Sequence, residues 1–378
     1  MKPTVLLIGL GDLGGVILEL LAREEGVGRI VTADLNEEGG TARCRVTRLG
    51  ALAHGRRPDI RFTRLDLANR EAVAEIVRRE APDLILSTAT LATWWLPNLL
   101  PDEQAARIKR AGFGVWLPVH LTPTLWLMEA LRDAGYPGHV VTAPFPDVVN
   151  PILGKVGLPP TCGIGNLSEM VPKIRLLAAE RLESPPEALR VYMVAHHALE
   201  RWVFAGPFGT ASDEMPPYFL RVEHAGADVT AAVDANDLLL APYPLPAGRV
   251  THFLTAGTTI PLIRALLADE ETFLHAPAPN GLPGGYPVLA GRGGVRPAPI
   301  EGLRLEEAIE INERSHRFDG IERIEEDGTA VFVSEPACIL RDELGYDCER
   351  LAPGEAEVRA GELVARFKEY AKKHGTDI

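Results

Sequence analysis

A glycine-rich turn near the N-terminus constrains the fold of this chain more than any other feature. The apolar run Thr4–Ile8 leads into the sequence GLGDLG at positions 9–14, and the next segment, 16–22, places its apolar residues on one helical face. A short run without polar residues is typical of a strand that is buried on both faces of a parallel sheet. The order strand, glycine turn, helix therefore predicts the first unit of a Rossmann-type sheet.

Each glycine of this turn has its own physical task. Gly9 permits the tight turn, Gly11 lets the backbone approach a pyrophosphate, and Gly14 lets the helix pack closely on the strand. The first helical turn then offers free N–H groups and a partial positive charge to phosphates. We therefore expect the cofactor contacts of a dinucleotide site at these glycines and at Asp12 and Leu13; a glycine-rich turn without a ligand is the alternative.

The residues that end the next strands indicate which dinucleotide binds. A second strand ends at Asp34, where a carboxylate can accept hydrogen bonds from ribose hydroxyls and would repel a 2′-phosphate. This predicts NAD, with NADP less favoured. The strand Asp83–Ser87 runs into the small residues Thr88 and Ala89, as expected where the carboxyl edge of a sheet faces its cofactor.

The alternation of strands and helices continues beyond this unit. Further segments with the pattern of strands or helices are 60–65, 113–117 and 140–143 for strands, and 70–79 and 125–131 for helices. The chain is therefore expected to have an α/β fold, with a Rossmann-type doubly wound parallel sheet. We place an NAD-binding domain at residues 1–150 and a mixed α/β catalytic domain at 151–378.

Composition limits the partners and the compartment. The formal net charge is −13, which argues against nucleic acid as a partner because a phosphate backbone needs a basic surface. Charged residues interrupt the N-terminal apolar run before it could span a membrane, and no signal peptide is expected. The four cysteines form no CxxC pair, which fits a reducing compartment. We expect a cytoplasmic protein that acts on a small molecule.

Several motifs in the second half carry a resemblance to a known superfamily. They are Asn150-Pro151, the glycine-containing turn 162–166, a long helix over 168–182, a strand that ends in His196-His197, and the glycine-rich segment 284–295. This succession resembles the lactate/malate dehydrogenase superfamily, which also contains the NAD-dependent family 4 glycosidases. The N-terminal glycine motif is also similar to that of saccharopine-dehydrogenase-type Rossmann proteins.

The resemblance implies an oxidoreductase that moves a hydride between a nicotinamide cofactor and a hydroxyl-bearing or amine-bearing carbon. His197 matches the catalytic histidine, and an imidazole can accept the hydroxyl proton as the hydride leaves. His196 is the second candidate, although neighbouring strand residues point to opposite faces. Asn150 would bind substrate or the nicotinamide ribose; a turn residue ahead of Pro151 is the alternative. The resemblance also implies a homodimer or homotetramer.

The chain departs from the dehydrogenase pattern where substrate should bind. The aspartate and arginine expected at the start of the long helix are missing, so Glu169 is the candidate to orient the histidine. Lys173 or Arg175 would bind an anionic group, and Thr255 would supply a pocket hydroxyl. We expect His120 to lie in an exposed loop; a place at the cleft is the alternative.

Two other function classes stay open. Cys162 and His197 stand roughly where the glycosidases bind a divalent metal, which would give an NAD- and metal-dependent hydrolase. A non-catalytic sensor that binds NAD without turnover is the third class.

Overall fold

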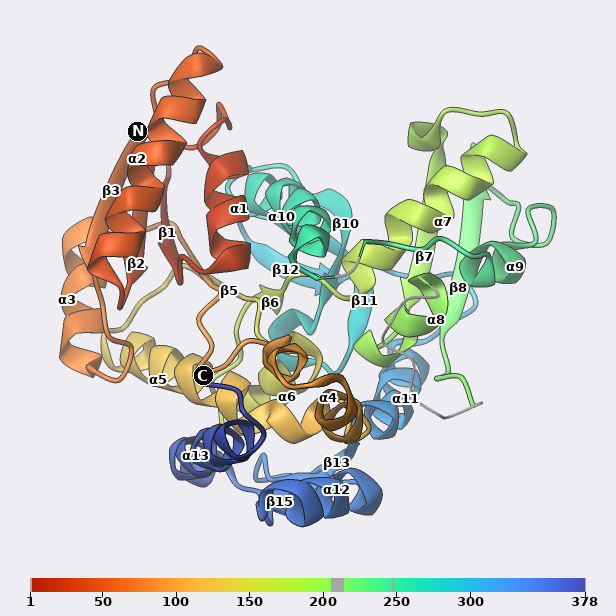
Figure 1. The fold of residues 1–378 in the computed structure, drawn as a ribbon. Helices are drawn as coiled ribbons and strands as arrows, with labels where there is room; N and C mark the ends of the chain where they lie inside the picture. Colours follow the sequence, from red (N-terminus) through yellow and green to blue (C-terminus); the bar gives the residue numbers. More distant parts are fainter. Residues whose placement is uncertain (1, 205–213, 247, 378) are drawn as a thin grey trace.

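The protein is described by a computed structural model that covers residues 2–204, 214–246 and 248–377. Its centre is a six-stranded parallel sheet with the order β3-β2-β1-β4-β5-β6, so the predicted doubly wound sheet is confirmed (Figure 1). The strands are β1 (Thr4–Ile8), β2 (Arg29–Asp34), β3 (Asp59–Arg64), β4 (Leu84–Ser87), β5 (His139–Thr142) and β6 (Cys162–Gly163).

Helices cover both faces of this sheet. Alternate residues of β1 enter separate cores. Val5 and Leu7 pack with α1 (Asp12–Leu21) and α10 (His252–Leu266), whereas Leu6 and Ile8 pack with α3 (Arg70–Glu80) and α5 (Leu117–Asp133). Burial on both faces explains why the strand contains no polar residue after Thr4. The helices of this half are α1 (Asp12–Leu21), α2 (Glu37–Ala53), α3 (Arg70–Glu80), α4 (Asp102–Lys109), α5 (Leu117–Asp133) and α6 (Pro146–Lys155).

The strand predicted at residues 113–117 is wrong. Gly114–Trp116 forms a 3₁₀ turn and α5 begins at Leu117, with Pro118 in its first turn. Proline is favoured in the first turn of a helix, because backbone N–H groups there have no acceptor within the helix and proline, which lacks an N–H, loses no hydrogen bond. The apolar run is buried, as a central strand would be. Over so few residues, the spacing of apolar side chains does not distinguish a buried strand from a buried helical turn.

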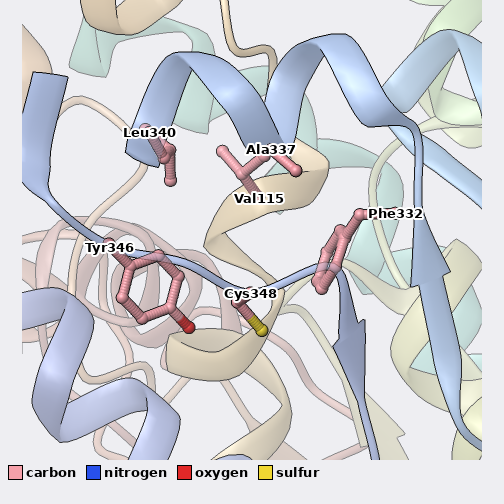
Figure 2. Close-up of a pocket in the computed structure, with 6 residues that line it drawn as sticks. All are labelled: Val115, Phe332, Ala337, Leu340, Tyr346 and Cys348. Atoms are coloured by element: carbon pink, nitrogen blue, oxygen red, sulfur yellow. The ribbon is translucent and has the colours of Figure 1, made fainter. Parts of the chain in front are cut away.

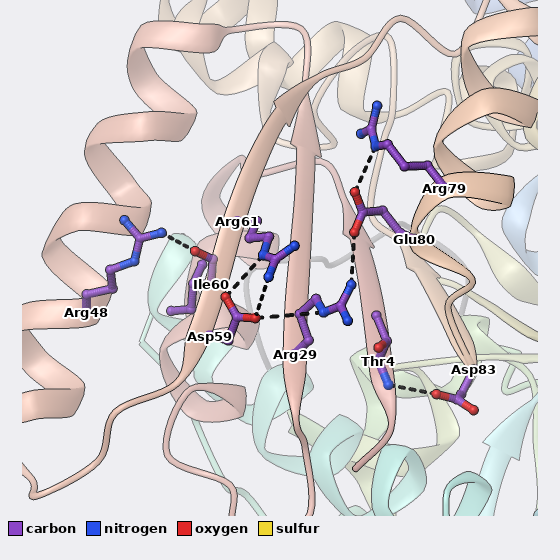
Figure 3. A network of polar contacts seen from close by, with 9 residues as sticks. All are labelled: Thr4, Arg29, Arg48, Asp59, Ile60, Arg61, Arg79, Glu80 and Asp83. Carbon is purple, nitrogen blue, oxygen red and sulfur yellow. Dashed lines mark hydrogen bonds and ion pairs between the residues drawn. The ribbon is translucent and has the colours of Figure 1, made fainter. Parts of the chain in front are cut away.

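Charged residues join the strands at the amino edge of the sheet (Figure 3). The N–H of Thr4 donates to Asp83 Oδ2 at 2.7 Å. Arg29 lies 3.2 Å from Glu80 and 3.8 Å from Asp59. Ion pairs thus occupy this edge, whereas the glycine turn lies at the opposite, carboxyl edge.

The second half of the chain adds three small antiparallel sheets. Their strands are β7 (Leu189–Val194), β8 (Phe219–His224) and β9 (Ala227–Asp228); β10 (Thr272–Pro277), β11 (Gly285–Gly291) and β12 (Gly294–Pro297); and β13 (Ile321–Ile324), β14 (Ala330–Phe332) and β15 (Arg350–Leu351). The helices are α7 (Leu167–Arg181), α8 (Glu200–Phe204), α9 (Ala235–Leu240), α10 (His252–Leu266), α11 (Leu305–Ser315), α12 (Ser334–Leu344) and α13 (Ala356–Lys373).

The C-terminal segment returns to the N-terminal half. Helix α13 packs along α5, and Phe367 lies edge-on to Trp116 with ring centroids 5.4 Å apart (Figure 1). A small apolar cavity lies at a second contact of the C-terminal segment with the first half, where Val115 faces Phe332 and Leu340 (Figure 2). Strand β6 also belongs to the first sheet although it follows residue 150. The chain therefore crosses between the two halves more than once.

No helix among the described residues is long and apolar enough to cross a membrane.

Candidate active site

In the glycine turn between β1 and α1, Gly9 and Gly14 have no room for a side chain, whereas Gly11 does. A Cβ at Gly14 would lie 1.9 Å from the carbonyl oxygen of Gly9, and Gly9 itself has φ +87°. By contrast, a Cβ at Gly11 would meet no heavy atom within 4 Å. Gly9 and Gly14 are thus required by backbone conformation and packing, whereas the space over Gly11 at the start of α1 is open to a ligand. Asp12, the next residue, pairs with Arg249 at 3.2 Å.

Asp34 is tied to this turn. Its Oδ2 accepts the N–H of Leu10 at 2.6 Å, and its Oδ1 accepts the N–H of Asn36 at 2.8 Å. The carboxylate therefore lies beside the turn, where the adenosine ribose of a dinucleotide is expected. Each carboxylate oxygen keeps a lone pair for a further donor.

The loop after β4 closes the other side of the turn. Thr88 donates its hydroxyl to the carbonyl oxygen of Gly9 at 2.9 Å, and Ala89 follows with a partly exposed side chain. Thr90 lies further along, and its Oγ1 is 3.0 Å from His120 Nδ1. The loop thus links the glycine turn to a group of aromatic rings.

That group contains three residues that the sequence did not identify as site residues. Phe113 stacks on His120, and its ring centroid is 5.1 Å from that of His197; Phe145 lies 5.9 Å from His197. His120 was expected in an exposed loop, and this expectation is wrong, because it is buried within α5. Burial lowers the pKa of His120 to about 3, so its ring stays neutral.

His197 stands at the centre of the polar groups. Strand β7 ends at Val194, and His197 opens a 3₁₀ turn. Its Nδ1 lies 2.7 Å from Asp319 Oδ2, and its backbone N–H donates to Asp147 Oδ2 at 2.6 Å. Burial alone would lower the pKa of His197, but the charge and hydrogen bond of Asp319, together with the charges of Glu200 and Asp147, outweigh burial and raise this pKa to about 10. The same pairing holds the pKa of Asp319 below its usual range although burial opposes it.

His196 approaches the same carboxylate. Its Nδ1 lies 3.2 Å from Asp319 Oδ2, its side chain is fully buried, and its ring is 5.0 Å from that of His316. The two histidines were expected to point to opposite faces of a strand. The strand ends before them, so the turn lets both nitrogens reach one oxygen.

Glu169 occupies the site in a different role from the expected one. Asp319, not Glu169, contacts His197 Nδ1. Glu169 accepts the hydroxyl of Thr255 at 2.7 Å and is hydrogen-bonded to Glu200, whose Oε2 lies 3.7 Å from His197 Nε2. Burial, followed by the charge of Glu200, raises the pKa of Glu169 well above its usual value.

The two cations expected to bind an anionic substrate do not contact His197. The ammonium group of Lys173 is buried and donates to the carbonyl oxygens of Val203, Leu239 and Ala241, which use all three of its protons. Arg175 is half-buried beside β10, and its charge acts on His275. No contact within the described chain links either cation to His197.

Asn150 lies inside α6 and not at the end of a strand. It is fully buried, and its Oδ1 accepts the hydroxyl of Thr142 at the end of β5, at 2.9 Å. Its Nδ2 has no hydrogen-bond partner among the described residues. This amide is the part of Asn150 that a ligand would use.

Cys162 and His197 do not come together in a metal site. Cys162 is fully buried in β6 with the apolar residues of the sheet, and burial raises the pKa of its thiol to about 12. In the part of the chain that the structure describes, no group of three or more His, Cys, Asp or Glu side chains is arranged to hold a metal ion. The donor set implied by the glycosidase resemblance therefore does not fit.

Comparisons with known proteins identify the fold. No protein-family model matches the sequence, and no curated protein matches it. Among solved structures, the chain is similar to malate dehydrogenase from Picrophilus torridus (TM-score 0.59, 16% identity, 84% of this chain and 97% of that chain). It is similar to Cryptosporidium parvum malate dehydrogenase (TM-score 0.58, 14% identity, 84% and 98%) and to Eimeria maxima lactate dehydrogenase with NADH and oxamate (TM-score 0.57, 13% identity, 84% and 93%). The predicted resemblance is thus confirmed at the level of the fold: the chain has a lactate/malate dehydrogenase-like α/β architecture.

Proposed function

We propose that this protein is an NAD-dependent oxidoreductase. It would transfer a hydride between the nicotinamide and a hydroxyl-bearing or amine-bearing carbon of a small polar substrate. The observation that carries the proposal is the 2.7 Å contact between His197 Nδ1 and Asp319 Oδ2. The ring of Phe113 lies between His197 and His120, and His120 contacts Thr90 in the loop after β4. The fold shared with dehydrogenases whose structures contain NADH or NAD supports it.

The cofactor would lie along the carboxyl edge of the sheet. Its pyrophosphate fits the open surface over Gly11 and the N-terminus of α1, with Gly9, Asp12, Leu13 and Gly14 around it. Thr88, Ala89 and the amide of Asn150 would lie toward the nicotinamide end. Asp34 favours NAD over NADP, because a second negative charge would meet its carboxylate.

His197 would exchange the substrate proton through Nε2. In the protonated ring, Nδ1–H donates to Asp319, which fixes the orientation of the imidazole and leaves Nε2 as the exchanging atom. When bound, the nicotinamide supplies or accepts the hydride. Because its pKa is about 10, His197 is cationic at neutral pH and is therefore ready to donate a proton to a carbonyl oxygen.

Of the two alternatives, neither has an observation in its favour. The metal-dependent hydrolase needs ligands that the described chain does not bring together. A sensor that binds NAD without turnover does not need the buried set of ionisable groups around His197.

We also propose a homodimer or homotetramer in the cytoplasm. Val46, Leu49 and Leu52 form an exposed apolar stripe on the outer face of α2, which supports self-association. All four cysteines are free, which suits a reducing compartment. Light scattering tests the assembly, and a monomer would contradict it.

The experiment combines cofactor binding with turnover. NADH binding is followed by fluorescence, and a panel of alcohols, amino alcohols and hydroxy acids is then assayed in both directions. We expect His197→Gln to keep NADH affinity and to lose at least about 100-fold in kcat, since a positioned acid or base contributes 10²–10⁴-fold. The exposed His54→Gln is the matched control. NADH binding without turnover of any substrate would favour the sensor, and absence of NADH binding would reject the proposal.

A further inference from the structure

Three segments that are far apart in the sequence meet at the start of α1. Arg249, in the 3₁₀ turn that precedes α10, lies 3.2 Å from the carboxylate of Asp12, the first residue of α1. Its guanidinium also lies over the ring of Trp95, in the loop after β4, with 5.8 Å between the guanidinium carbon and the ring centroid. Arg249 thus connects the glycine turn with the loop after β4 and with the start of α10.

A second contact holds the loop after β4 to α10. The Nε1–H of Trp94 donates to His252 Nε2 at 3.3 Å, and His252 is buried as the first residue of α10. Since Nε2 accepts this hydrogen bond, the ring of His252 is neutral, and its burial lowers its pKa. The charges of Asp12 and Arg249 both act on this ring. The positive charge at this place therefore belongs to Arg249 and not to His252.

Most of the Arg249 guanidinium is available to a ligand. A guanidinium carries five N–H donors, and the contact with Asp12 uses only Nη1. Within the described chain, the side chain of Arg249 makes no other hydrogen bond. It is 67% exposed, and exposed ion pairs of this kind contribute little to stability. The remaining N–H groups can therefore bind an anion without loss of a structural contact.

Arg249 stands where the anionic part of a dinucleotide would lie. The first N–H groups of α1 have no acceptor within the helix, no side chain caps them, and the space over Gly11 is open. The carboxylate of Asp12 would by itself repel a pyrophosphate, and Arg249 offsets this charge. Another cation near the turn, Arg43, packs against Gly15, further along α1. Among the described cations, Arg249 is thus the one in contact with the first residue of α1.

We infer that Arg249 binds the pyrophosphate of the cofactor, through N–H groups other than the one that contacts Asp12. The planar fork of a guanidinium matches two phosphate oxygens at once, and the ring of Trp95 supports it from one side. Arg249 lies 237 positions from Asp12 in the sequence, so the glycine motif does not indicate it. The inference rests on the proposed function, because it takes the space over Gly11 as the pyrophosphate site.

Isothermal titration calorimetry with NADH and with ADP-ribose, which keeps the pyrophosphate and lacks the nicotinamide, tests this inference. Arg249→Gln is expected to bind both ligands about tenfold more weakly, because a charge-assisted hydrogen bond is lost. Its melting temperature should be unchanged, since the side chain is exposed. Arg249→Lys retains the charge and should bind both ligands within about threefold of the wild type. A loss for NADH without a loss for ADP-ribose would overturn the inference.

Salt dependence distinguishes a phosphate contact from a structural role. High salt screens an exposed contact between a cation and a phosphate, so the loss in Arg249→Gln should shrink to within about threefold. An equal loss at low and high salt would overturn the inference.

Arg264→Gln is the matched control. Arg264 also joins α10 to the chain beside α1, through Glu24 at 2.8 Å, and it is similarly exposed at 62%. This variant should bind both ligands like the wild type. A loss as large as that of Arg249→Gln would assign the effect to the contact between α1 and α10 and would overturn the inference.

The inference and the proposed function fail in different ways. If the wild type binds NADH and Arg249→Gln binds it equally well, the inference is overturned and the proposed function stands. If the wild type does not bind NADH, the proposed function is rejected and the inference with it.

Discussion

Nδ1 of His197 lies 2.7 Å from Oδ2 of Asp319, a residue 122 positions further along the chain. The histidine follows β7, whereas the aspartate belongs to the 3₁₀ turn His316–Asp319 after α11. The fold thus brings a potential acid and the carboxylate that sets its charge together from two distant segments. Four consequences for activity and stability follow from this pair, from the glycine turn and from Asp34 beside that turn.

Removing the carboxylate should change the pH dependence of catalysis. In the wild type the pKa of His197 is raised to about 10 against the effect of burial, and Asp319 is the carboxylate that contributes most to the rise. Asp319→Asn removes the charge of this carboxylate. In the reduction direction, the pH above which kcat/KM declines should therefore be lower by at least about 2 units. A pH profile of NADH oxidation checks this, with the exposed Asp269→Asn as control. An unchanged profile would show that Asp319 does not set the protonation of His197.

The same pair should make stability depend on pH in a defined window. The native pKa of His197 is raised from 6.5 to about 10, so the native state holds this proton more tightly than the unfolded state does. The contribution is fully present below pH 6.5 and is lost as the pH rises to about 10. Since the side chain is 25% exposed, we expect the loss to be on the order of 2 kcal/mol.

Urea unfolding at the two ends of this window measures that loss. His197→Gln should show a flatter dependence over the same window, whereas His54→Gln should behave like the wild type. Equal slopes in wild type and His197→Gln would contradict the pairing in solution. Asp319 acts at the other end of the scale: its lowered pKa predicts a further loss of stability as the pH falls below its ordinary value of 3.8.

Two glycines of the turn should respond differently to alanine. At Gly11 the added methyl group meets no protein atom within 4 Å, so Gly11→Ala should fold with an unchanged melting temperature. It should nevertheless weaken NADH binding by about tenfold, because the methyl group would stand where the pyrophosphate approaches. Gly14→Ala places a methyl group 1.9 Å from a carbonyl oxygen and should lower the melting temperature. Thermal melts and NADH titrations distinguish the two variants, and an unaffected NADH affinity in Gly11→Ala would place the cofactor elsewhere.

Asp34 should determine the choice between the two nicotinamide cofactors. Asp34→Asn removes the negative charge while retaining an acceptor for Leu10 N–H, so the turn should survive. The ratio of NAD to NADP affinity should fall by about tenfold. Asp66→Asn, an exposed residue that follows β3, is the control. A ratio that does not change would mean that the ribose of the cofactor does not contact Asp34.

The first half of the fold could be predicted because its signals are local. Thr4–Ile8 is apolar throughout since both of its faces are covered, and the glycines at 9, 11 and 14 follow from the backbone geometry that the turn requires. The long helix expected over 168–182 is also present, as α7. It was wrong at Phe113–Leu117, where a short apolar run fits a strand and a buried turn equally well.

The site could be predicted only in part because its contacts are not local. His197 and Glu169 were chosen by their positions, but nothing in the sequence near either residue indicates Asp319 as the partner of His197. Lys173 and Arg175 have the charge needed for an anionic ligand, yet the sequence does not show that backbone carbonyl oxygens already occupy the ammonium group of Lys173. A cation or carboxylate can be identified from sequence, whereas the group that neutralises it depends on the tertiary structure.

The most direct test of the central claim is an NMR titration of the His197 ring, assigned with His197→Gln and recorded with and without NADH. The claim predicts a pKa near 10 in the free protein and a resonance that shifts when NADH binds, because the ring lies beside the nicotinamide. An ordinary histidine pKa near 6.5, together with a resonance that does not respond to NADH, would contradict it.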